Sequence, residues 1–361
     1  MTPTTANSAP QASVASERLP GIDLLRVAAM FMVVLLHLLI WNESDGCPVP
    51  AGTYRAIARY LRAECVCAVD LFVLASGFLL ATRRFRFSRI VRLALQVYLT
   101  SLAIRLVASA ATRSTVDWSG FFSDYWFWNA YLVVAFLSPV LNAALRVLRR
   151  KWSVPGVRTF LAALALAFAV VPLPCGLGFV ERGYTGLWFV VPYLIGAEIA
   201  LEGEEGRLTF SRLWSAEALA WILPLVGWAG SSAMRRVPDL AHLSLNGSYA
   251  SPIILAVATC HLLFFANLRI APLPRLLRLA AATAFGVYLI HAHPLAQPFF
   301  RRLLDAFTLR TFTPALLATT LLFALLLYIA CSLLDGVRLF LFARMNRLRQ
   351  RTGVARSFRF C

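Results

Sequence analysis

Apolar residues along this chain come in long blocks rather than in alternation with polar residues. A helix needs ~20 predominantly apolar residues to cross a bilayer, and most of the blocks approach that length. The pattern predicts about ten membrane-spanning helices, at residues 22–41, 66–82, 90–109, 126–145, 157–173, 184–201, 214–230, 249–267, 279–296 and 313–342. We therefore expect an all-α, polytopic integral membrane protein.

The composition supports a membrane protein. Hydrophobic residues make up 60% of the 361 positions and the mean hydropathy is +0.71, whereas a soluble domain is usually under about half apolar. A formal net charge of +18 would also suit nucleic-acid binding, but the basic residues lie between the apolar blocks. The anionic inner leaflet accounts for them better, so membrane lipids, and no nucleic acid, are the expected partners.

The distribution of charge predicts the orientation of the chain. Most of the 35 Lys and Arg residues fall in segments that are cytoplasmic if both termini are inside, as expected from the enrichment of positive charge in cytoplasmic loops. The chain then divides into a disordered polar tail at 1–18, a transmembrane domain at 19–344 and a basic cytoplasmic tail at 345–361. A short amphipathic helix at 53–64, with Arg55, Arg59 and Arg62 on one side, is expected on the outer surface.

The seven cysteines show no metal-ligand spacing, so no metal is expected. Cys260 and Cys331 lie in apolar blocks and predict core packing. A disulfide is an option near the predicted outer face, but its pairing cannot be assigned from spacing among Cys47, Cys65, Cys67 and Cys175.

The first apolar block carries the ionisable residues Asp23, Arg26 and His37. Arg26 and His37 are eleven positions apart, which places them on one helix face, ~16 Å apart along the axis. Asp23 lies one turn earlier on the same stripe. Ionisable residues inside a span usually face the protein interior and mark a functional path. The alternative is that Asp23 and Arg26 reach to the surface and that His37 is a structural histidine.

The predicted topology places further polar residues near the outer ends of several membrane-spanning helices, where they would come together. They are Asp70, Arg105, His291 and His293. A histidine titrates near neutrality and serves as a general base once a second group orients it. Asp70 and His291 are the candidates to orient His37. The alternatives are a solvated helix end for Asp70 and a structural role for His293.

On the predicted inner side, five arginines follow the second block: Arg83, Arg84, Arg86, Arg89 and Arg92. Guanidinium groups bind phosphate bidentately, so these residues are candidates to hold a phosphate-bearing donor. The alternative is that they only fix orientation, and no glycine-rich phosphate loop accompanies them.

Tryptophans concentrate on the predicted outer side. An aromatic belt at the membrane interface accounts for most of them, and a platform that stacks sugar rings is the alternative. The candidates for binding an acceptor on this side are Trp126, Trp128, Asn129, Trp188 and Arg105.

Several motifs occur in a fixed order along the chain. They are the Arg26 to His37 spacing, VDLFVLASGFLL at 69–80, the Arg89 and Arg92 pair, YWFWNAYLVVAFLSPVLN at 125–142, GLWFVVPYLIGAEI at 186–199 and FGVYLIH at 285–291. Together they resemble the membrane-bound acyltransferase family 3, and within it the bacterial enzymes that O-acetylate surface polysaccharides. The resemblance runs from Leu19 to about Arg344.

This resemblance implies an enzyme of the bacterial cytoplasmic membrane with no permanently bound cofactor. Its co-substrate would be cytoplasmic acetyl-CoA or another acyl-CoA, and its acceptor a hydroxyl of a cell-surface glycan or its lipid-linked precursor. The resemblance also implies that Arg26 and His37 are essential, and that the inner arginines match the basic stretch of the family. Members often carry a proline shortly after that stretch, where this chain has Leu95 and Gln96. No additional soluble domain that delivers substrate is expected.

We therefore expect His37 to act as a base or as a nucleophile that carries the acyl group, oriented by Asp70 or His291. Arg26 would hold the donor or the developing charge. One alternative is a transporter or flippase for an anionic glycolipid, with the same arginines lining its pathway. Another is a catalytically inert partner of a second membrane protein. The acceptor sugar, the acyl chain and the oligomeric state are not defined by the sequence.

The predicted topology is tested by labelling single cysteines from outside intact cells. Probes introduced at Ser44, Gly120 and Arg302 should react, and probes at Arg84 and Arg150 should not. External labelling at Arg84 would invert the topology and place the arginines away from a cytoplasmic donor.

Overall fold

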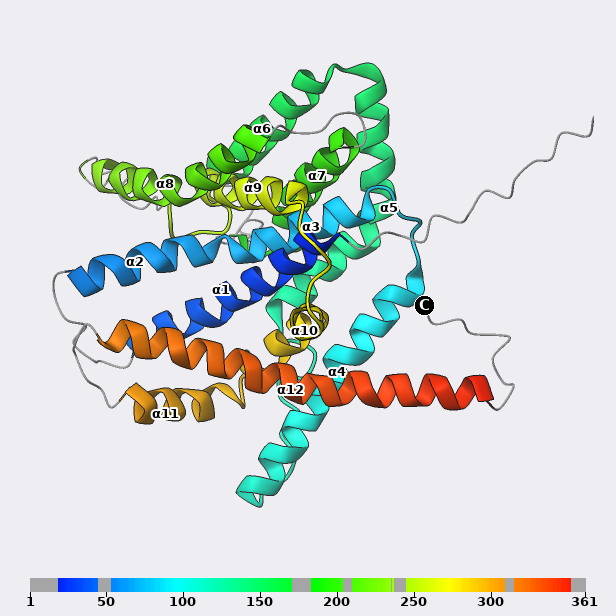
Figure 1. The fold of residues 1–361 in the computed structure, drawn as a ribbon, viewed down its shortest axis with the longest axis vertical. Coiled ribbons are helices and arrows are strands. Elements are labelled where there is room, and N and C mark those ends of the chain that lie inside the picture. Colours follow the sequence, from blue (N-terminus) through cyan, green and yellow to red (C-terminus); the bar gives the residue numbers. More distant parts are fainter. Residues whose placement is uncertain are drawn as a thin grey trace, which may run out of the picture.

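The computed structural model describes residues 19–44, 53–170, 183–203, 210–234, 236, 245–308 and 315–351. Every regular element in these ranges is a helix, so the predicted all-α class is confirmed (Figure 1). The helices are α1 (Pro20–Ser44), α2 (Thr53–Val66), α3 (Ala68–Leu80), α4 (Phe87–Thr112), α5 (Trp126–Lys151), α6 (Val154–Val170), α7 (Gly186–Gly203), α8 (Phe210–Met234), α9 (Pro252–Asn267), α10 (Arg275–His291), α11 (Gln297–Thr308) and α12 (Ala315–Arg351).

Six helical segments in the described ranges are long and apolar enough to cross a membrane: Pro20–Asn42, Arg55–Leu80, Phe87–Thr112, Trp126–Lys151, Gly186–Gly203 and Ala315–Met345. Two shorter apolar helices are Val154–Ala169 and Pro252–Asn267. The chain is therefore a multi-pass membrane protein. Each predicted span coincides with a helix, whereas the number of ten spans and the cytoplasmic termini stay predictions.

Helices α2 and α3 follow each other with only a turn at Cys67 between them. The helix predicted at 53–64 is present and belongs to the helix bundle, while its place on the outer surface stays a prediction. It packs against α1, α8 and α9, and its end from Ala63 to Val66 is buried. Helix α11 was not predicted, and α12 continues to Arg351 through the start of the predicted basic tail. The tail predicted at 1–18 lies outside the described residues.

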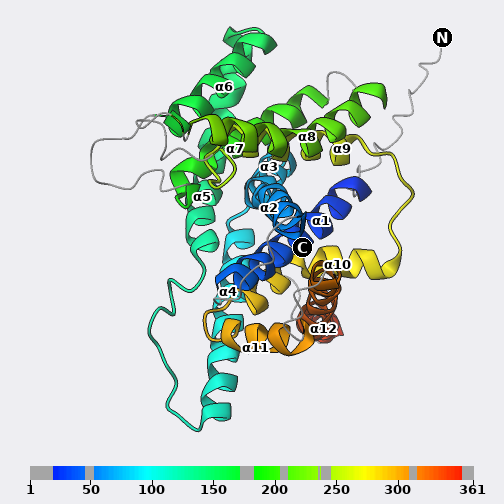
Figure 2. The same cartoon turned by 90° about the vertical axis from the view of Figure 1, so that its left-hand side faces the viewer.

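Helix α1 occupies the middle of the bundle, between α6 to α9 on one side and α11 and α12 on the other (Figures 1 and 2). It packs against α2, α3, α9, α10 and α12. Leu25, Ala29, Val34 and Leu38 are all buried although they lie on different sides of α1, so this helix is enclosed by its neighbours. The face of α1 that carries His37 is thereby fixed relative to α3 and α10.

Two glycines bring α3 and α7 into close contact. A Cβ atom added at Gly77 would lie 2.0 Å from the carbonyl oxygen of Tyr193, and one at Gly196 would lie 2.0 Å from that of Leu74. Small residues let helix backbones approach closely inside membranes, where packing rather than water exclusion drives association. Gly77 and Gly196 therefore fix α3 onto α7. Helix α3 carries residues Ser76 to Phe78, which we call the SGF segment.

Helix α5 completes this unit by capping the end of α3. The Asn142 amide donates to the Leu80 carbonyl oxygen at 3.0 Å, and the Arg146 guanidinium donates to that of Ala81 at 2.6 Å. The Tyr193 hydroxyl donates to the Asn142 side-chain oxygen at 3.2 Å. The last carbonyl groups of a helix need such partners because they have none within the helix. Helices α3, α5 and α7 thus form one connected support.

A buried ionic cluster joins α2, α8 and α9. His261 Nε2 lies 2.7 Å from Glu64 Oε1, and His261 Nδ1 lies 3.0 Å from Glu217 Oε2. Each ring nitrogen of His261 thus shares a hydrogen bond with a carboxyl group from a different helix. Such a cluster holds its helices together, because removing one member would leave a buried charge unpaired.

The described cysteines Cys65, Cys67, Cys260 and Cys331 are buried, free thiols. Core packing of Cys260 and Cys331 is thus confirmed, and Cys65 and Cys67 form no disulfide. Cys47 and Cys175 lie outside the described residues.

The α3–α7 contact predicts different effects of two Gly→Ala substitutions on the same helix. Gly196→Ala should lower the free energy of unfolding by about 1–3 kcal/mol, because the new methyl group overlaps the α3 backbone. Gly203→Ala is the control, since no atom lies within 4 Å of its added Cβ. Thermal unfolding of the purified protein in detergent measures both. Equal melting temperatures would show that the two helices are not packed this tightly.

Candidate active site

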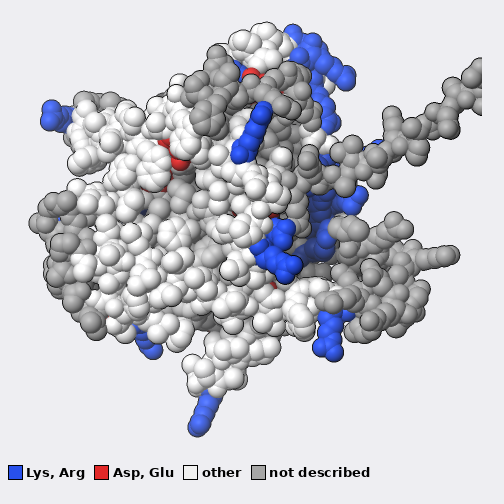
Figure 3. Space-filling view, in the orientation of Figure 1, with Lys and Arg blue, Asp and Glu red and all other residues white. Residues whose placement is uncertain are grey.

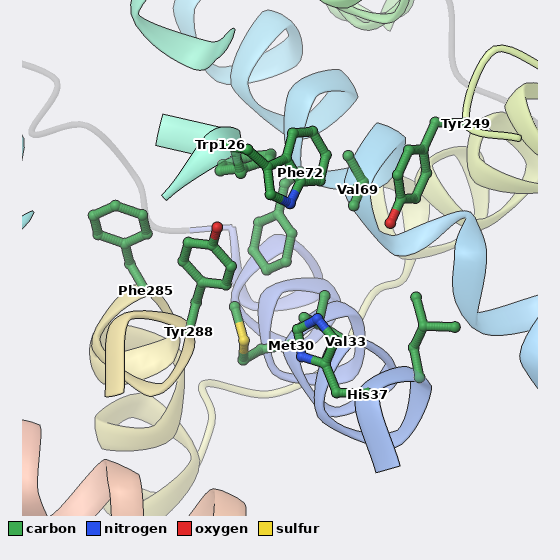
Figure 4. Close-up of a pocket in the computed structure, with 11 residues that line it drawn as sticks. Met30, Val33, His37, Val69, Phe72, Trp126, Tyr249, Phe285 and Tyr288 are labelled. Atoms are coloured by element: carbon green, nitrogen blue, oxygen red, sulfur yellow. The ribbon is translucent and has the colours of Figure 1, made fainter. Parts of the chain in front are cut away.

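A pocket opens between α1, α3, α5 and α10 beside His37 (Figure 4). It encloses ≈ 510 Å³ not filled by protein atoms, part of which is open to solvent. Its wall is mainly apolar and aromatic, formed by Met30, Val33, Leu36, His37, Val69, Phe72, Trp126, Phe127, Tyr249, Phe285 and Tyr288. An apolar cavity with a few polar groups in defined positions is typical of a small-molecule site.

His37 and His291 form a hydrogen-bonded pair at this pocket. His37 Nδ1 lies 2.9 Å from His291 Nε2, and His291 Nδ1 lies 2.6 Å from the Val287 carbonyl oxygen. Because a carbonyl oxygen only accepts, the proton of neutral His291 lies on Nδ1 and its Nε2 accepts. Neutral His37 must then donate from Nδ1, which leaves a lone pair on its Nε2. The pair thus fixes the tautomer of the histidine that lines the pocket.

A stacked tryptophan also holds the His37 ring, and an arginine packs against that tryptophan in turn. Trp41, one turn along α1, stacks on it with ring centroids 6.2 Å apart and planes inclined by 9°. The Arg301 guanidinium of α11 lies 5.4 Å from the Trp41 ring centroid, within the range of a cation–π contact. His37 is therefore oriented by α10 through a hydrogen bond and by Trp41 through stacking.

Asp70, the other residue expected to orient His37, has a different partner. It is fully buried, and its Oδ1 accepts a hydrogen bond from Trp188 Nε1 at 2.9 Å. Its Oδ2 has no hydrogen-bond partner among the described residues. The contact joins α3 to α7, so of the two candidates it is His291 that reaches His37.

Arg26 lies on the same helix as His37 but toward its N-terminal end. Its guanidinium is 4.0 Å from the Asp23 carboxylate, and both side chains are partly exposed, at 37% and 24%. Tyr131 of α5 and Tyr328 of α12 lie close enough to interact electrostatically with the Arg26 guanidinium group. Arg26 therefore lies near other helices and is not in contact with His37, and its role stays a prediction.

The five arginines predicted to bind the donor lie around the start of α4. Arg83, Arg84 and Arg86 are exposed, while Arg89 and Arg92 are half-buried on the first turns of α4. Lys and Arg side chains gather on the side of Figure 3 where α4 begins in Figure 1. Within the described residues, no carboxylate pairs with Arg83, Arg84, Arg86 or Arg89. Like charges held together without a counterion favour binding of an anion.

Tyr131 connects these arginines to the first helix. It lies within reach of the Ser76 hydroxyl of the SGF segment and near the guanidinium groups of both Arg26 and Arg89. Tyr131 was not predicted, because nothing in its spacing relates it to residues on α1, α3 and α4. The positive charge thus extends from the start of α4 to Arg26.

Of the five acceptor candidates, only Trp126 lines the pocket. Trp128 and Trp188 are buried in the core. Asn129 is exposed, and its amide donates to the Phe122 carbonyl oxygen at 3.1 Å. Arg105 is buried and donates to Ser101, to the Asp124 carboxylate and to the carbonyl oxygens of Asp117 and Ser119. Its hydrogen-bonding capacity is therefore used within the protein.

The pocket also contains aromatic residues that were not predicted. Trp126 stacks on Tyr249 with centroids 5.5 Å apart and planes inclined by 24°. Tyr288 and Phe285 come from the FGVYLIH segment, where Tyr288 lies three residues before His291 and Phe285 three residues before Tyr288, so each is a neighbour of the next on the helix surface. That spacing could have indicated Tyr288 and Phe285, whereas Tyr249 precedes α9 and carries no such signal.

Comparison with known families identifies the class of the protein. A family model described as an acyltransferase domain, acyltransferase family 3, matches residues 19–329. The chain therefore belongs to this family and is a membrane acyltransferase, as the sequence motifs predicted. No curated protein and no solved structure matches the chain.

Proposed function

We propose that this protein is an O-acyltransferase of the bacterial cytoplasmic membrane, which moves an acetyl group from cytoplasmic acyl-CoA to a hydroxyl of a cell-surface glycan or its lipid-linked precursor. The observation that supports this most strongly is the His37–His291 pair. It presents an imidazole lone pair at an aromatic pocket and fixes the tautomer, as expected of a general base that a second group orients.

In this proposal, His37 Nε2 removes the proton of the acceptor hydroxyl as its oxygen attacks the thioester carbonyl carbon. The C–O bond forms, the C–S bond breaks, and the proton passes from His37 to the leaving thiolate. The products are an ester and free thiol, so atoms and charge balance. His291 keeps the His37 ring aimed and accepts its Nδ1–H throughout, which stabilises the imidazolium formed during the reaction.

The donor is proposed to enter from the end of the molecule where α4 begins. Its phosphates would contact Arg89 and Arg92, which are the two of the five arginines that lie within α4 itself. The narrow pantetheine arm would then run past Arg26 toward His37. The separation of ~16 Å between these two residues along α1 suits a donor held at its phosphates and reacting at its far end.

The acceptor is proposed to enter the same pocket from the opposite side. Trp126, Tyr249 and Tyr288 offer aromatic faces and polar edges around His37. Aromatic rings of this kind combine apolar area with a hydrogen-bonding edge, which suits the faces and hydroxyls of a sugar. The surface glycan of a deletion strain should lack the mass of one acyl group per modified sugar, measured by mass spectrometry.

His37→Gln tests the proposed base. Glutamine keeps polarity and similar size but cannot take up a proton, so acyl transfer should fall by a factor of ~10² or more. The measurement is acylated acceptor formed by purified protein, at equal amounts of folded enzyme. His293→Gln should lose much less activity, because its amide still offers an N–H to Asp124.

A His37→Gln enzyme with near wild-type transfer would remove the catalytic assignment. If the wild-type protein consumed no thioester but moved glycolipid between leaflets of a vesicle, the transporter alternative would replace the acyltransferase mechanism proposed here.

Arg89→Gln with Arg92→Gln tests the donor site. Each lost charged hydrogen bond should cost ~1.5–3 kcal/mol of donor binding, so the KM for acyl-CoA should rise at least tenfold. Arg113→Gln is the matched control, because Arg113 is an exposed arginine just beyond the opposite end of α4. An unchanged KM in the double variant would leave these arginines as orientation signals only.

A further inference from the structure

A buried network of polar side chains lies beyond the pocket. It consists of Arg105, Ser101, Asp124 and His293, and we call this network the outer clamp. These residues come from α4, from the segment before α5 and from the turn after α10. The side chains of Arg105, Asp124 and His293 are 2%, 3% and 0% exposed. Burying a charged pair is costly unless it is fully hydrogen-bonded, so the positions of these side chains are narrowly defined.

Asp124 is the centre of the outer clamp. Its carboxylate accepts hydrogen bonds from Arg105 Nη2 at 2.7 and 2.8 Å and from the Ser101 hydroxyl at 2.7 Å. His293 Nε2 lies 3.2 Å from the same carboxylate. His293 Nδ1 accepts from the Leu295 amide at 3.1 Å, so in the neutral ring the proton lies on Nε2 and points to Asp124. The groups that surround the Asp124 carboxylate are thus all hydrogen-bond donors, so the side chain at position 124 must be an acceptor.

The outer clamp is directly connected to two parts of the proposed active site, the end of α10 that carries His291 and the start of α5 that lines the pocket. His293 is two residues after His291, and the hydroxyl of Tyr125, the residue after Asp124, donates to the Leu289 carbonyl oxygen at 2.7 Å. The Tyr125 ring also packs against His293 and Tyr288, with centroids 5.7 and 5.8 Å apart. Asp124 and Tyr125 lead straight into Trp126 and Phe127, which line the pocket.

We propose that Asp124 is a positioning residue for acyl transfer, acting through His293 and Tyr125 on the end of α10 that carries His291. This inference rests on the proposed function. The 2.9 Å contact between His37 and His291 joins α1 to α10, and α10 ends at His291. The outer clamp holds that end in place from α4 and from the start of α5. Misplacement of a catalytic group by about 1 Å can cost 10²-fold in rate.

The test compares Asp124→Asn with Asp117→Asn. In the first variant the new side-chain amide would turn an N–H₂ toward the donors of Arg105, Ser101 or His293, so kcat should fall about tenfold or more while the KM for acyl-CoA changes less than twofold. Asp117 lies in the same loop, contacts Arg105 only through its backbone carbonyl oxygen and has an exposed side chain, so D117N removes one carboxylate without removing a contact to the outer clamp. It should change neither constant more than twofold.

A second variant and a double variant keep the test independent of stability. Tyr125→Phe removes only the hydrogen bond to Leu289 and should lower kcat in the same direction, with no change in KM. In a His291→Ala background, Asp124→Asn should add little further loss, because residues that act as a unit are not additive. A full additional loss in that background, or Asp124→Asn activity equal to that of Asp117→Asn, would overturn the proposal. An inactive wild-type enzyme would instead overturn the proposed function.

Discussion

The structure depends on one hydrogen bond between helices far apart in sequence, from His37 Nδ1 to His291 Nε2. His291 is fully buried, so its two ring nitrogens depend on His37 and on the α10 backbone for hydrogen bonds. A buried polar group without a partner costs ~1–3 kcal/mol, and this cost selects one arrangement of α1 against α10. The same selection presents the remaining nitrogen of His37 to the pocket, so the stability of the fold and the readiness of the proposed base have a common origin.

Two kinds of support keep this contact in place. On one side, the glycines of α3 and α7 and the capping of α3 by Asn142 and Arg146 give a tightly packed wall. On the other side, ionic contacts take over, with Arg105 and Asp124 near the end of α10. Close backbone packing suits the membrane interior, where small residues make helices adhere, whereas buried ion pairs suit the segments where loops return into the protein. The pocket lies between the closely packed helices α3 and α7 on one side and the Arg105–Asp124 ion pair on the other.

Much of this arrangement could be predicted from residues that repeat with helical spacing. The apolar blocks gave the helices, and the distance from Arg26 to His37 gave their common face. The partner of His37 could only be narrowed to two candidates, because pairing between α1 and α10 is a long-range choice among similar side chains. Arg105 was expected to bind the acceptor substrate, yet its N–H groups donate to Asp124 and to two loop carbonyl oxygens. Asp124 had no sequence signal, since an acidic residue before a helix looks like any solvated loop residue.

Helix α4 is a single straight element of 26 residues that carries Arg89 and Arg92 at its beginning and Ser101 and Arg105 further along. Among the described helices, it packs mainly against α5 and α10. If the start of α4 binds the donor as proposed, this helix links an anion site at one end to a polar anchor further along and acts as a rigid lever. Any tilt that bound phosphate imposes on its first turn is carried to the anchor beside His291, and thermodynamic linkage makes the effect reciprocal. Donor occupancy on one face of the membrane and acceptor affinity on the other would then be coupled through α4, without a contact between the two substrates.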